Sequence, residues 1–161
     1  KNLLIAIDEN NAPLRNMIIW NKNRQNISNS DYKSKYELIL YGWKDRSWFG
    51  SKGDNDVWEM QKLNKAELHP TQKPVELVEK AISNSSVTAG LVVDPFLGSG
   101  STLIAAQKTG RRCYGLEIDP IYCDVIVKRW EAFTGKKAKL SGYEGTFEDL
   151  ALEREHATAS A

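Results

Sequence analysis

The chain has 161 residues, of which 41% are hydrophobic and 27% are charged, with a formal net charge of +1. This length and composition predict one ordinary folded domain and exclude a wholly disordered chain. No apolar run approaches the roughly 18 residues that would cross a membrane, and no signal peptide opens the sequence. Because the first residue is Lys1 rather than Met, we expect the chain to be part of a longer protein.

The small net charge hides an uneven distribution. Between Ala12 and Lys52 there are eight basic and three acidic residues, whereas Leu140 to Ala161 hold five acidic residues and one basic residue. A basic stretch favours a surface that faces phosphate groups, and a solvated loop is the alternative.

Two strands are predicted in the first half of the chain. The apolar runs Asn16 to Trp20 and Tyr36 to Trp43 have the length and the aliphatic content of buried strands. The Asn- and Ser-rich residues between them indicate a loop. A second irregular stretch, holding several aromatic side chains, follows as far as about Leu68.

The second half alternates strands with helices, which is typical of an α/β fold with a parallel sheet. Asp119 is the expected cap of the helix that begins at Pro120, and Gly135 is its expected stop. The predicted elements are a helix over 75–83, a strand over 91–96, a helix over 102–109, a strand over 112–118, a helix over 120–133, a short strand over 137–140, and a tail that is either a frayed helix or disordered.

The two cysteines, Cys113 and Cys123, are too few for a disulfide framework or a structural zinc site. Their apolar surroundings predict reduced core residues, and hence a cytoplasmic protein. No metal ligands are predicted.

The most informative segment is VVDPFLGSGST, in which a strand ends at Asp94 and two glycines, Gly98 and Gly100, precede a helix. Glycines there let the backbone approach a ligand, and the helix start presents free N–H groups. A nucleotide P-loop is disfavoured because no Lys follows Gly100, and a dinucleotide fingerprint is incomplete because Leu103 holds the place of its third glycine.

Two carboxylates narrow the choice of ligand. Asp94, beside the glycines, would repel a pyrophosphate and attract an ammonium group. Glu117, which ends the next strand, is placed to accept hydrogen bonds from ribose hydroxyls. S-adenosylmethionine has both a ribose and an ammonium, whereas a tight turn with incidental acids is the alternative.

Three motifs resemble those of a known family, the DNA amino-methyltransferases in their β-type motif order. HPTQKP (His69 to Pro74) looks like motif X, DPFLGSG (Asp94 to Gly100) like motif I and GLEIDP (Gly115 to Pro120) like motif II. The resemblance covers about residues 14 to 140. It implies a Rossmann-like fold of S-adenosylmethionine-dependent methyltransferases, with a mostly parallel sheet and helices on both faces, present here in incomplete form.

The resemblance also implies roles for single residues. Glu117 would bind the ribose, and Thr71 and Lys73 would lie near the cofactor's carboxylate, as a hydroxyl and a lysine beside a helix start can form an anion site. Lys73 could instead be a solvated cap, and His69 reads better as a turn residue than as a proton-transfer group. The residues expected at the methionine part are Asp94, Phe96, Gly98 and Gly100.

Residues 41–68 lie where the family has its target-recognition segment. Basic and aromatic side chains there suit phosphate contacts and base stacking. Trp43 and Trp58 could instead be core anchors of a long loop. The expected DNA contacts are Lys44, Arg46, Trp48 and Lys52.

The family's catalytic motif, Asp/Asn/Ser-Pro-Pro-aromatic, does not occur in the sequence, so no catalytic residue is predicted. The similar string DPIY (Asp119 to Tyr122) lacks the second proline and reads as a helix cap. We expect the motif in a missing N-terminal half or in a second chain. The resemblance implies that the absent strands lie between the Leu91 strand and the Tyr36 strand.

These observations together predict the cofactor-binding and recognition part of a DNA methyltransferase that acts on an exocyclic amine, adenine N6 being favoured over cytosine N4. The expected partner is double-stranded DNA, and a homodimer is possible. Residues 1–140 would form the partial methyltransferase domain, with 69–140 as its cofactor-binding part and 141–161 as an acidic tail. The alternative is a non-catalytic cofactor- or DNA-binding fragment, and an NAD-dependent oxidoreductase is disfavoured by Leu103 and Asp94.

Overall fold

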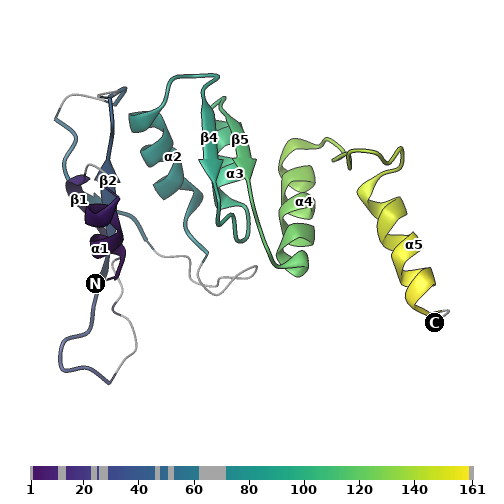
Figure 1. Ribbon diagram of the computed structural model, residues 1–161, viewed down its shortest axis with the longest axis horizontal. Helices are drawn as coiled ribbons and strands as arrows, with labels where there is room; N and C mark the ends of the chain where they lie inside the picture. The colour runs from purple at the N-terminus through teal and green to yellow at the C-terminus, as the bar shows by residue number, and fades with distance from the viewer. Residues whose placement is uncertain are drawn as a thin grey trace.

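The computed structural model describes residues 2–10, 14–22, 25, 29–45, 48–50, 53–61 and 72–159 (Figure 1). None of the helices in this part of the chain is long and apolar enough to cross a bilayer. The helices are α1 (Asn2–Glu9), α2 (Val75–Ser85), α3 (Ser101–Lys108), α4 (Pro120–Thr134) and α5 (Phe147–Ala159), and the strands are β1 (Leu14–Asn21), β2 (Tyr36–Gly42), β3 (Val57–Glu59), β4 (Leu91–Asp94) and β5 (Arg112–Gly115).

The strands form two sheets. In the first sheet, β1 is central and pairs antiparallel with β2 and parallel with β3. In the second sheet, β4 and β5 pair in parallel, with Asp94 opposite Gly115 at the carboxyl end. The predicted α/β class with parallel strands is therefore confirmed, although the described strands are divided between two sheets.

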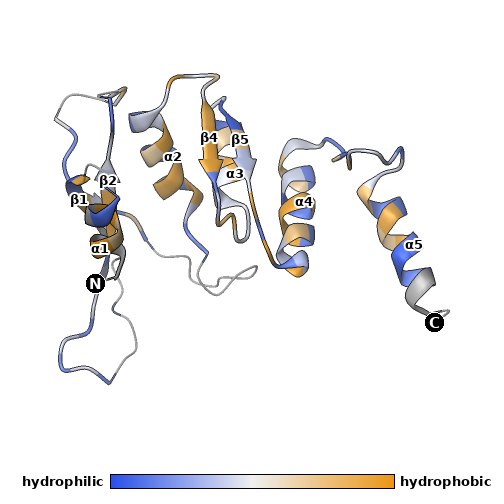
Figure 2. Ribbon diagram, in the orientation of Figure 1, coloured by the Kyte–Doolittle hydropathy of each residue, from blue (hydrophilic) through white to orange (hydrophobic). Residues whose placement is uncertain are grey.

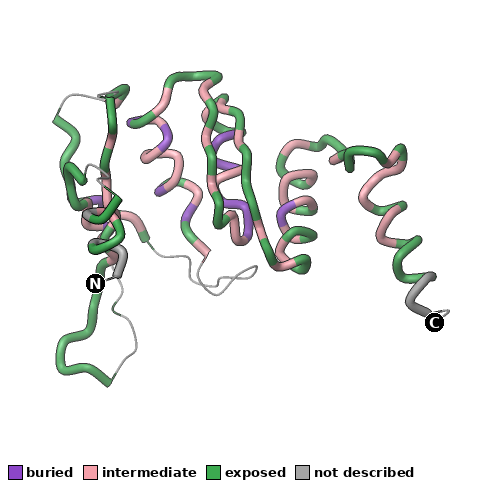
Figure 3. The backbone as a smooth tube through the Cα atoms, viewed as in Figure 1, coloured by how far each residue is buried: buried purple, intermediate pink, exposed green. Residues whose placement is uncertain are grey.

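Helix α2 lies between the two sheets and packs against both (Figure 1). On one side, Leu77 contacts the buried indoles of Trp20 and Trp58. On the other side, Ile82 packs against Ala105 and Ala106 of α3, which are fully buried. The buried residues of the tube in Figure 3 are accordingly concentrated on α2, on α3 and at the turn that begins α3. The starts of α2 and α3 lie close together, because the Ser101 hydroxyl at the start of α3 donates to the Lys73 carbonyl just before α2 at 2.9 Å.

The parallel pair β4–β5 has one covered and one open face. Val92 and Cys113 point into the cluster formed with α2 and α3. On the other face Val93 and Tyr114 are 63% and 64% exposed, although β4 is hydrophobic along its length (Figure 2). Parallel strands are normally buried on both faces. Among the described residues, the helices α2 and α3 cover the face of the β4–β5 pair that holds Val92 and Cys113.

Local chemistry explains the boundaries of α4. The Asp119 carboxylate accepts a hydrogen bond from the Ile121 N–H at 2.9 Å, Pro120 occupies the first turn, and Gly135 ends the helix with a φ of 69°. The prediction of DPIY as a helix cap is therefore confirmed. The tail holds the helix α5, which follows a turn in which the Thr146 N–H and hydroxyl donate to Asp149.

Three expectations were wrong, and one element had not been predicted. Residues 137–140 form no strand, and the stretch expected to be irregular contains the short strand β3. Helix α1 is the element for which no prediction was made. Cys123 is exposed rather than in the core, because it lies in the first turn of α4 beside an open pocket that α4 shares with α5. Cys113 is half-buried, and burial, followed by the charge of Asp94, raises the pKa of its thiol.

Candidate functional site

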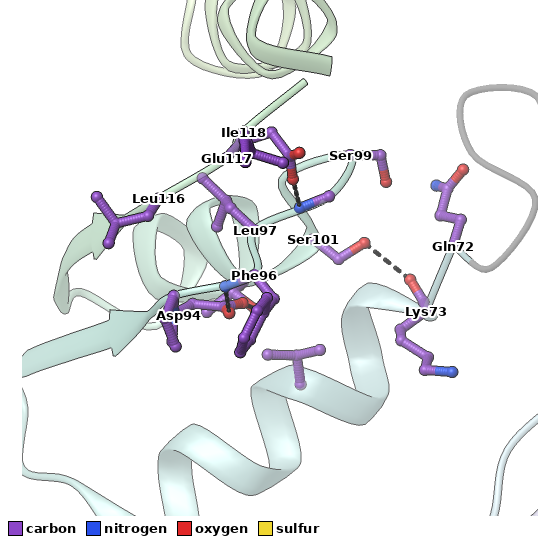
Figure 4. Close-up of a pocket in the computed structure, with 14 residues that line it drawn as sticks. Gln72, Lys73, Asp94, Phe96, Leu97, Ser99, Ser101, Leu116, Glu117 and Ile118 are labelled. Carbon is purple, nitrogen blue, oxygen red and sulfur yellow. Dashed lines mark hydrogen bonds between the residues drawn. The ribbon is translucent and has the colours of Figure 1, made fainter. Parts of the chain in front are cut away.

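A pocket of about 720 Å³ lies at the carboxyl ends of β4 and β5, between the glycine turn and the start of α2 (Figure 4). This is the edge at which ligands bind in open α/β sheets. The pocket is lined by Gln72, Lys73, Val78, Asp94, Pro95, Phe96, Leu97, Gly98, Ser99, Ser101, Thr102, Leu116, Glu117 and Ile118. The structure thus brings Lys73 together with five residues predicted from the motifs, namely Asp94, Phe96, Gly98, Glu117 and, by backbone adjacency to Ser99 and Ser101, Gly100.

The turn between β4 and α3 depends on two glycines in the left-handed region, with φ of 57° at Gly98 and 81° at Gly100. A Cβ at Gly98 would meet nothing within 4 Å, whereas one at Gly100 would lie 3.3 Å from the Ile126 side chain. The turn is closed by the Gly100 N–H, which donates to the Leu97 carbonyl at 2.9 Å. Gly98 therefore leaves open space beside its backbone, and Gly100 allows close packing on α4.

Asp94, the last residue of β4, is held by one donor from the following turn and one from the first turn of α3. One carboxylate oxygen accepts from the Phe96 N–H at 2.9 Å, and the other accepts from the Thr102 hydroxyl at 2.6 Å. Each oxygen has a second lone pair, so the carboxylate can still accept from a ligand. The neighbouring Phe96 ring is 87% exposed at the pocket. A fixed negative charge beside an exposed aromatic ring suits a cationic ligand.

Glu117 connects the end of β5 to the glycine turn (Figure 4). One of its carboxylate oxygens accepts from the Gly98 N–H at 2.7 Å, and the other accepts from the Asp119 N–H at 3.0 Å. The same side chain therefore lines the pocket and fixes the turn. The sequence pattern predicted that Glu117 lines the pocket, but not that it fixes the turn. No local spacing predicts a contact between residues that lie 19 positions apart.

Lys73 lines the pocket, but its ammonium group is engaged on the side of the first sheet. Its Nζ lies 2.7 Å from a Glu37 carboxylate oxygen and 5.5 Å from the centroid of the Trp20 ring. The other Glu37 oxygen lies 3.2 Å from Nζ of the buried Lys22. Partial burial raises the pKa of Glu37, but the hydrogen bonds and charges of the two lysines outweigh it and hold the pKa below its ordinary value. Thr71 and His69 lie outside the described residues.

A guanidinium group supports the glycine turn from behind. Nη1 of Arg129 on α4 donates to the Ser99 carbonyl at 2.9 Å and lies 3.3 Å from the hydroxyl oxygens of Ser99 and Ser101. The Ser101 hydroxyl donates to the Lys73 carbonyl at 2.9 Å. Burial lowers the pKa of Arg129. Sequence reasoning missed this residue, for which the only signal was a basic residue within a half-apolar helix.

The two predicted DNA contacts that the structure describes, Lys44 and Trp48, do not line this pocket. Lys44 and Trp48 are both exposed. The neighbouring Phe49 donates its N–H to the carbonyl of Asn84, at the carboxyl end of α2, whereas the pocket adjoins the start of that helix at Lys73. An 11-residue helix spans roughly 15 Å, which separates the two regions. The other two predicted contacts, Arg46 and Lys52, lie outside the described residues.

Trp43 and Trp58, for which the sequence left open a role as core anchors, differ in their burial. Trp58 is 4% exposed, and its indole N–H donates to the Asn55 carbonyl, so it is a core anchor. Trp43 is half-buried, and the Arg15 guanidinium carbon lies 4.4 Å from its ring centroid. Arg15, Trp43 and Trp48 line a surface hollow of about 370 Å³. Cationic and aromatic groups therefore gather on this end of the first sheet.

Comparisons with known proteins agree with this geometry. A family model described as DNA methylase matches residues 1–128. The chain is 31% identical to the type II methyltransferase M2.DpnII of Streptococcus pneumoniae over 147 residues, which cover 80% of this chain and 55% of that protein. Against several such relatives, the chain spans about half of their length.

Two solved structures show the same fold. The structure of M1.HpyAVI in complex with SAM superposes with a TM-score of 0.64 at 29% identity, covering 80% of this chain and 71% of that one. The cytosine-N4-specific PvuII DNA methyltransferase superposes with a TM-score of 0.67 at 19% identity, covering 86% of this chain and 57% of that one. The fold of this chain is therefore that of DNA methyltransferases.

Proposed function

The chain belongs to the DNA methylase family, and we propose that it is the cofactor-binding and target-recognition part of an S-adenosylmethionine-dependent DNA methyltransferase. The observation that carries the proposal is the pocket, in which Asp94 and Glu117 stand on either side of a glycine turn at the carboxyl edge of a parallel sheet. In this proposal, residues 1–140 are the partial methyltransferase domain, with 69–140 binding the cofactor and 41–68 contacting DNA.

The pocket fits the cofactor in size and in chemistry. Its volume falls within the roughly 300 to 1,000 Å³ of small-molecule sites. The open space beside Gly98 lets a ligand approach the backbone, and two carboxylates suit an ammonium and a pair of ribose hydroxyls. When bound, S-adenosylmethionine supplies an electrophilic methyl group on a sulfonium. The residues of this chain bind and orient that group.

We assign the binding roles as follows. Asp94 holds the ammonium group, Glu117 accepts from the ribose hydroxyls, and Thr71 and Lys73 lie near the carboxylate. In the structure, Nζ of Lys73 pairs with Glu37. We therefore propose that the lysine attracts the carboxylate of the cofactor electrostatically from this position, or after its side chain rotates away from Glu37. The residues that contact the rest of the methionine part are Phe96, Gly98 and Gly100.

The methyl acceptor is an exocyclic amine of a base in double-stranded DNA, and we favour adenine N6 over cytosine N4. We propose Lys44, Arg46, Trp48 and Lys52 as DNA contacts beyond the target base. The described part of this segment next to Trp48 lies roughly one length of α2 from the pocket, which is compatible with one DNA duplex, whose major groove alone is about 12 Å wide. Such contacts position the duplex rather than read the target base. A protein with this role works in the cytoplasm of its cell.

The catalytic Pro-Pro-aromatic motif is absent from the sequence, and we propose that a complementing segment supplies it, either as an N-terminal half or as a second chain. The open face of β4 and β5, with Val93 and Tyr114 more than half exposed, supports a further layer of protein there. A homodimer could cover the same face. The alternative function is a non-catalytic fragment that binds cofactor or DNA, which the missing motif favours.

Transfer of a labelled methyl group to DNA tests the proposal. The chain is assayed alone and with an added segment that carries the catalytic motif, and the labelled nucleoside is identified after digestion. We expect transfer to adenine only with the segment present, and none with Asp94→Asn in the chain. Robust methyl transfer by the chain alone would overturn the proposal that a complementing segment must supply the catalytic motif. Cofactor binding without transfer in any combination would favour the non-catalytic alternative.

A further inference from the structure

We propose that Arg129 is a positioning residue, which holds the glycine turn in the shape that the cofactor requires. The inference rests on the proposed function, since it concerns the same pocket. Arg129 does not line that pocket. It lies on α4, behind the turn, and acts through Ser99 and Ser101.

The turn needs support from outside because of its own composition. Gly98 and Gly100 both have positive φ, and neither has a side chain that could anchor the backbone. Ser99, between them, is 4% exposed. A buried carbonyl at such a position needs a hydrogen-bond donor. The Arg129 guanidinium supplies it at 2.9 Å.

One nitrogen of Arg129 fixes both sides of the pocket. Besides the Ser99 carbonyl, it lies 3.3 Å from the Ser101 hydroxyl, which in turn donates to the Lys73 carbonyl at 2.9 Å. Lys73 precedes α2 and lines the opposite wall. The contacts therefore run from α4 through the turn to the start of α2, and a shift of the guanidinium would move the turn relative to Lys73.

The charge of Arg129 is directed at this turn. Among the residues that the structure describes, no carboxylate forms an ion pair with Arg129, whereas three oxygens of Ser99 and Ser101 surround Nη1. Hydrogen bonds from a charged donor are stronger than neutral ones, and the planar guanidinium fixes their direction. A lysine would retain the charge at this place without that directional geometry.

Two measurements on the full chain test the role of Arg129. The first is amide hydrogen exchange over residues 96–101 and, as an internal reference, over α2. The second is the affinity for S-adenosylmethionine by calorimetry. In Arg129→Lys we expect exchange in the turn to accelerate about tenfold, exchange in α2 to stay unchanged, and affinity to fall by about ten- to a hundredfold.

Two further variants complete the design. Lys128→Met changes the neighbouring, exposed position of α4, and we expect exchange and affinity to stay within twofold of the native chain. Ser101→Ala removes the Ser101 contact of Arg129 together with the connection to Lys73, but keeps the contact with the Ser99 carbonyl, so it should give a smaller change of the same sign as Arg129→Lys. Ser101→Ala decides the matter if Arg129→Lys does not fold.

The outcomes separate this inference from the proposed function. A native chain that binds no S-adenosylmethionine would count against the proposed function. Hydrogen exchange in the turn would still test the positioning role of Arg129. Turn exchange in Arg129→Lys that matches the native chain would overturn the positioning role. Acceleration spread equally over the turn and α2 would overturn it as well, because Arg129 would then support only global stability.

Discussion

The Glu117 carboxylate accepts a hydrogen bond from the Gly98 N–H at 2.7 Å and so joins the end of β5 to the turn after β4. This contact places the proposed ribose acceptor and the proposed methionine-binding turn in one rigid unit. A change at Glu117 should therefore affect both the shape of the turn and the binding of the cofactor.

Glu117→Gln preserves the shape of the side chain but removes its charge. We expect the affinity for S-adenosylmethionine to fall about tenfold or more, and the free energy of unfolding to fall by about 1 to 2 kcal/mol, because the Gly98 N–H loses a charged acceptor. Calorimetry and urea denaturation measure the two effects. Glu144→Gln, at an exposed position, is the control. Unchanged affinity in Glu117→Gln would remove Glu117 from the binding site.

The two glycines of the turn should differ in their tolerance of a methyl group. Gly98→Ala should lower the free energy of unfolding by about 1 to 2 kcal/mol, which is the cost of an alanine in the left-handed region. No steric cost is added, because its Cβ would meet open space. Gly100→Ala adds the same cost together with a tight contact to Ile126 at 3.3 Å, and should be the more destabilising. Urea denaturation gives the order, and a larger loss in Gly98→Ala would contradict the packing described for Gly100.

Glu37 makes a pH-dependent contribution to stability. Its pKa in the folded chain lies below its ordinary value of 4.5, since the two lysines outweigh the effect of partial burial. A depressed carboxyl pKa stabilises the fold above the unfolded value, and this stabilisation is lost as the pH falls through the folded value. We expect Glu37→Gln to lower the free energy of unfolding by about 1 kcal/mol at pH 7, an amount discounted for solvent screening.

The same comparison at low pH provides the check on Glu37. The difference between the native chain and Glu37→Gln should shrink as the pH falls below 4.5. Asp31→Asn, at an exposed position, serves as the control for replacing an acidic side chain by its amide. A difference that stays constant as the pH falls from about 7 to about 3 would show that the charge of Glu37 does not stabilise the fold through its contacts with Lys22 and Lys73.

Lys44 tests the proposed DNA surface. If it contacts a phosphate, Lys44→Ala should weaken binding to all duplex sequences alike and lower the slope of log affinity against log salt by about one. Fluorescence anisotropy with a labelled duplex at several salt concentrations measures the slope. Lys136→Ala, at an exposed position just after α4, is the matched control. Equal slopes in both variants would place the DNA elsewhere.

The sequence predicted those features that depend on neighbouring residues. The cap at Asp119 and the stop at Gly135 follow from local hydrogen bonding and backbone preference, so both were found. The Val57–Glu59 strand was missed because three residues carry too little pattern and depend on pairing with β1. The contact between Arg129 and Ser99 spans 30 positions, and no sequence period announces it.

The features of the site divide in the same way into those that the sequence predicts and those that depend on distant contacts. Motif spacing predicted that Asp94 and Glu117 would meet at one pocket, because the carboxyl ends of adjacent parallel strands share an edge. It could not predict that Nζ of Lys73 pairs with Glu37, since that contact depends on how the two sheets pack around α2. The open face of β4 and β5 was likewise visible only once the positions of the helices were known.

The most direct test of the central claim is calorimetric titration of the folded chain with S-adenosylmethionine, beside Asp94→Asn. The pocket predicts one binding site in the native chain and an affinity at least about tenfold lower in the variant, because a neutral amide cannot offset the ammonium charge. Circular dichroism establishes that both proteins are folded. No binding by the folded native chain, or equal affinity in the two proteins, would contradict the assignment.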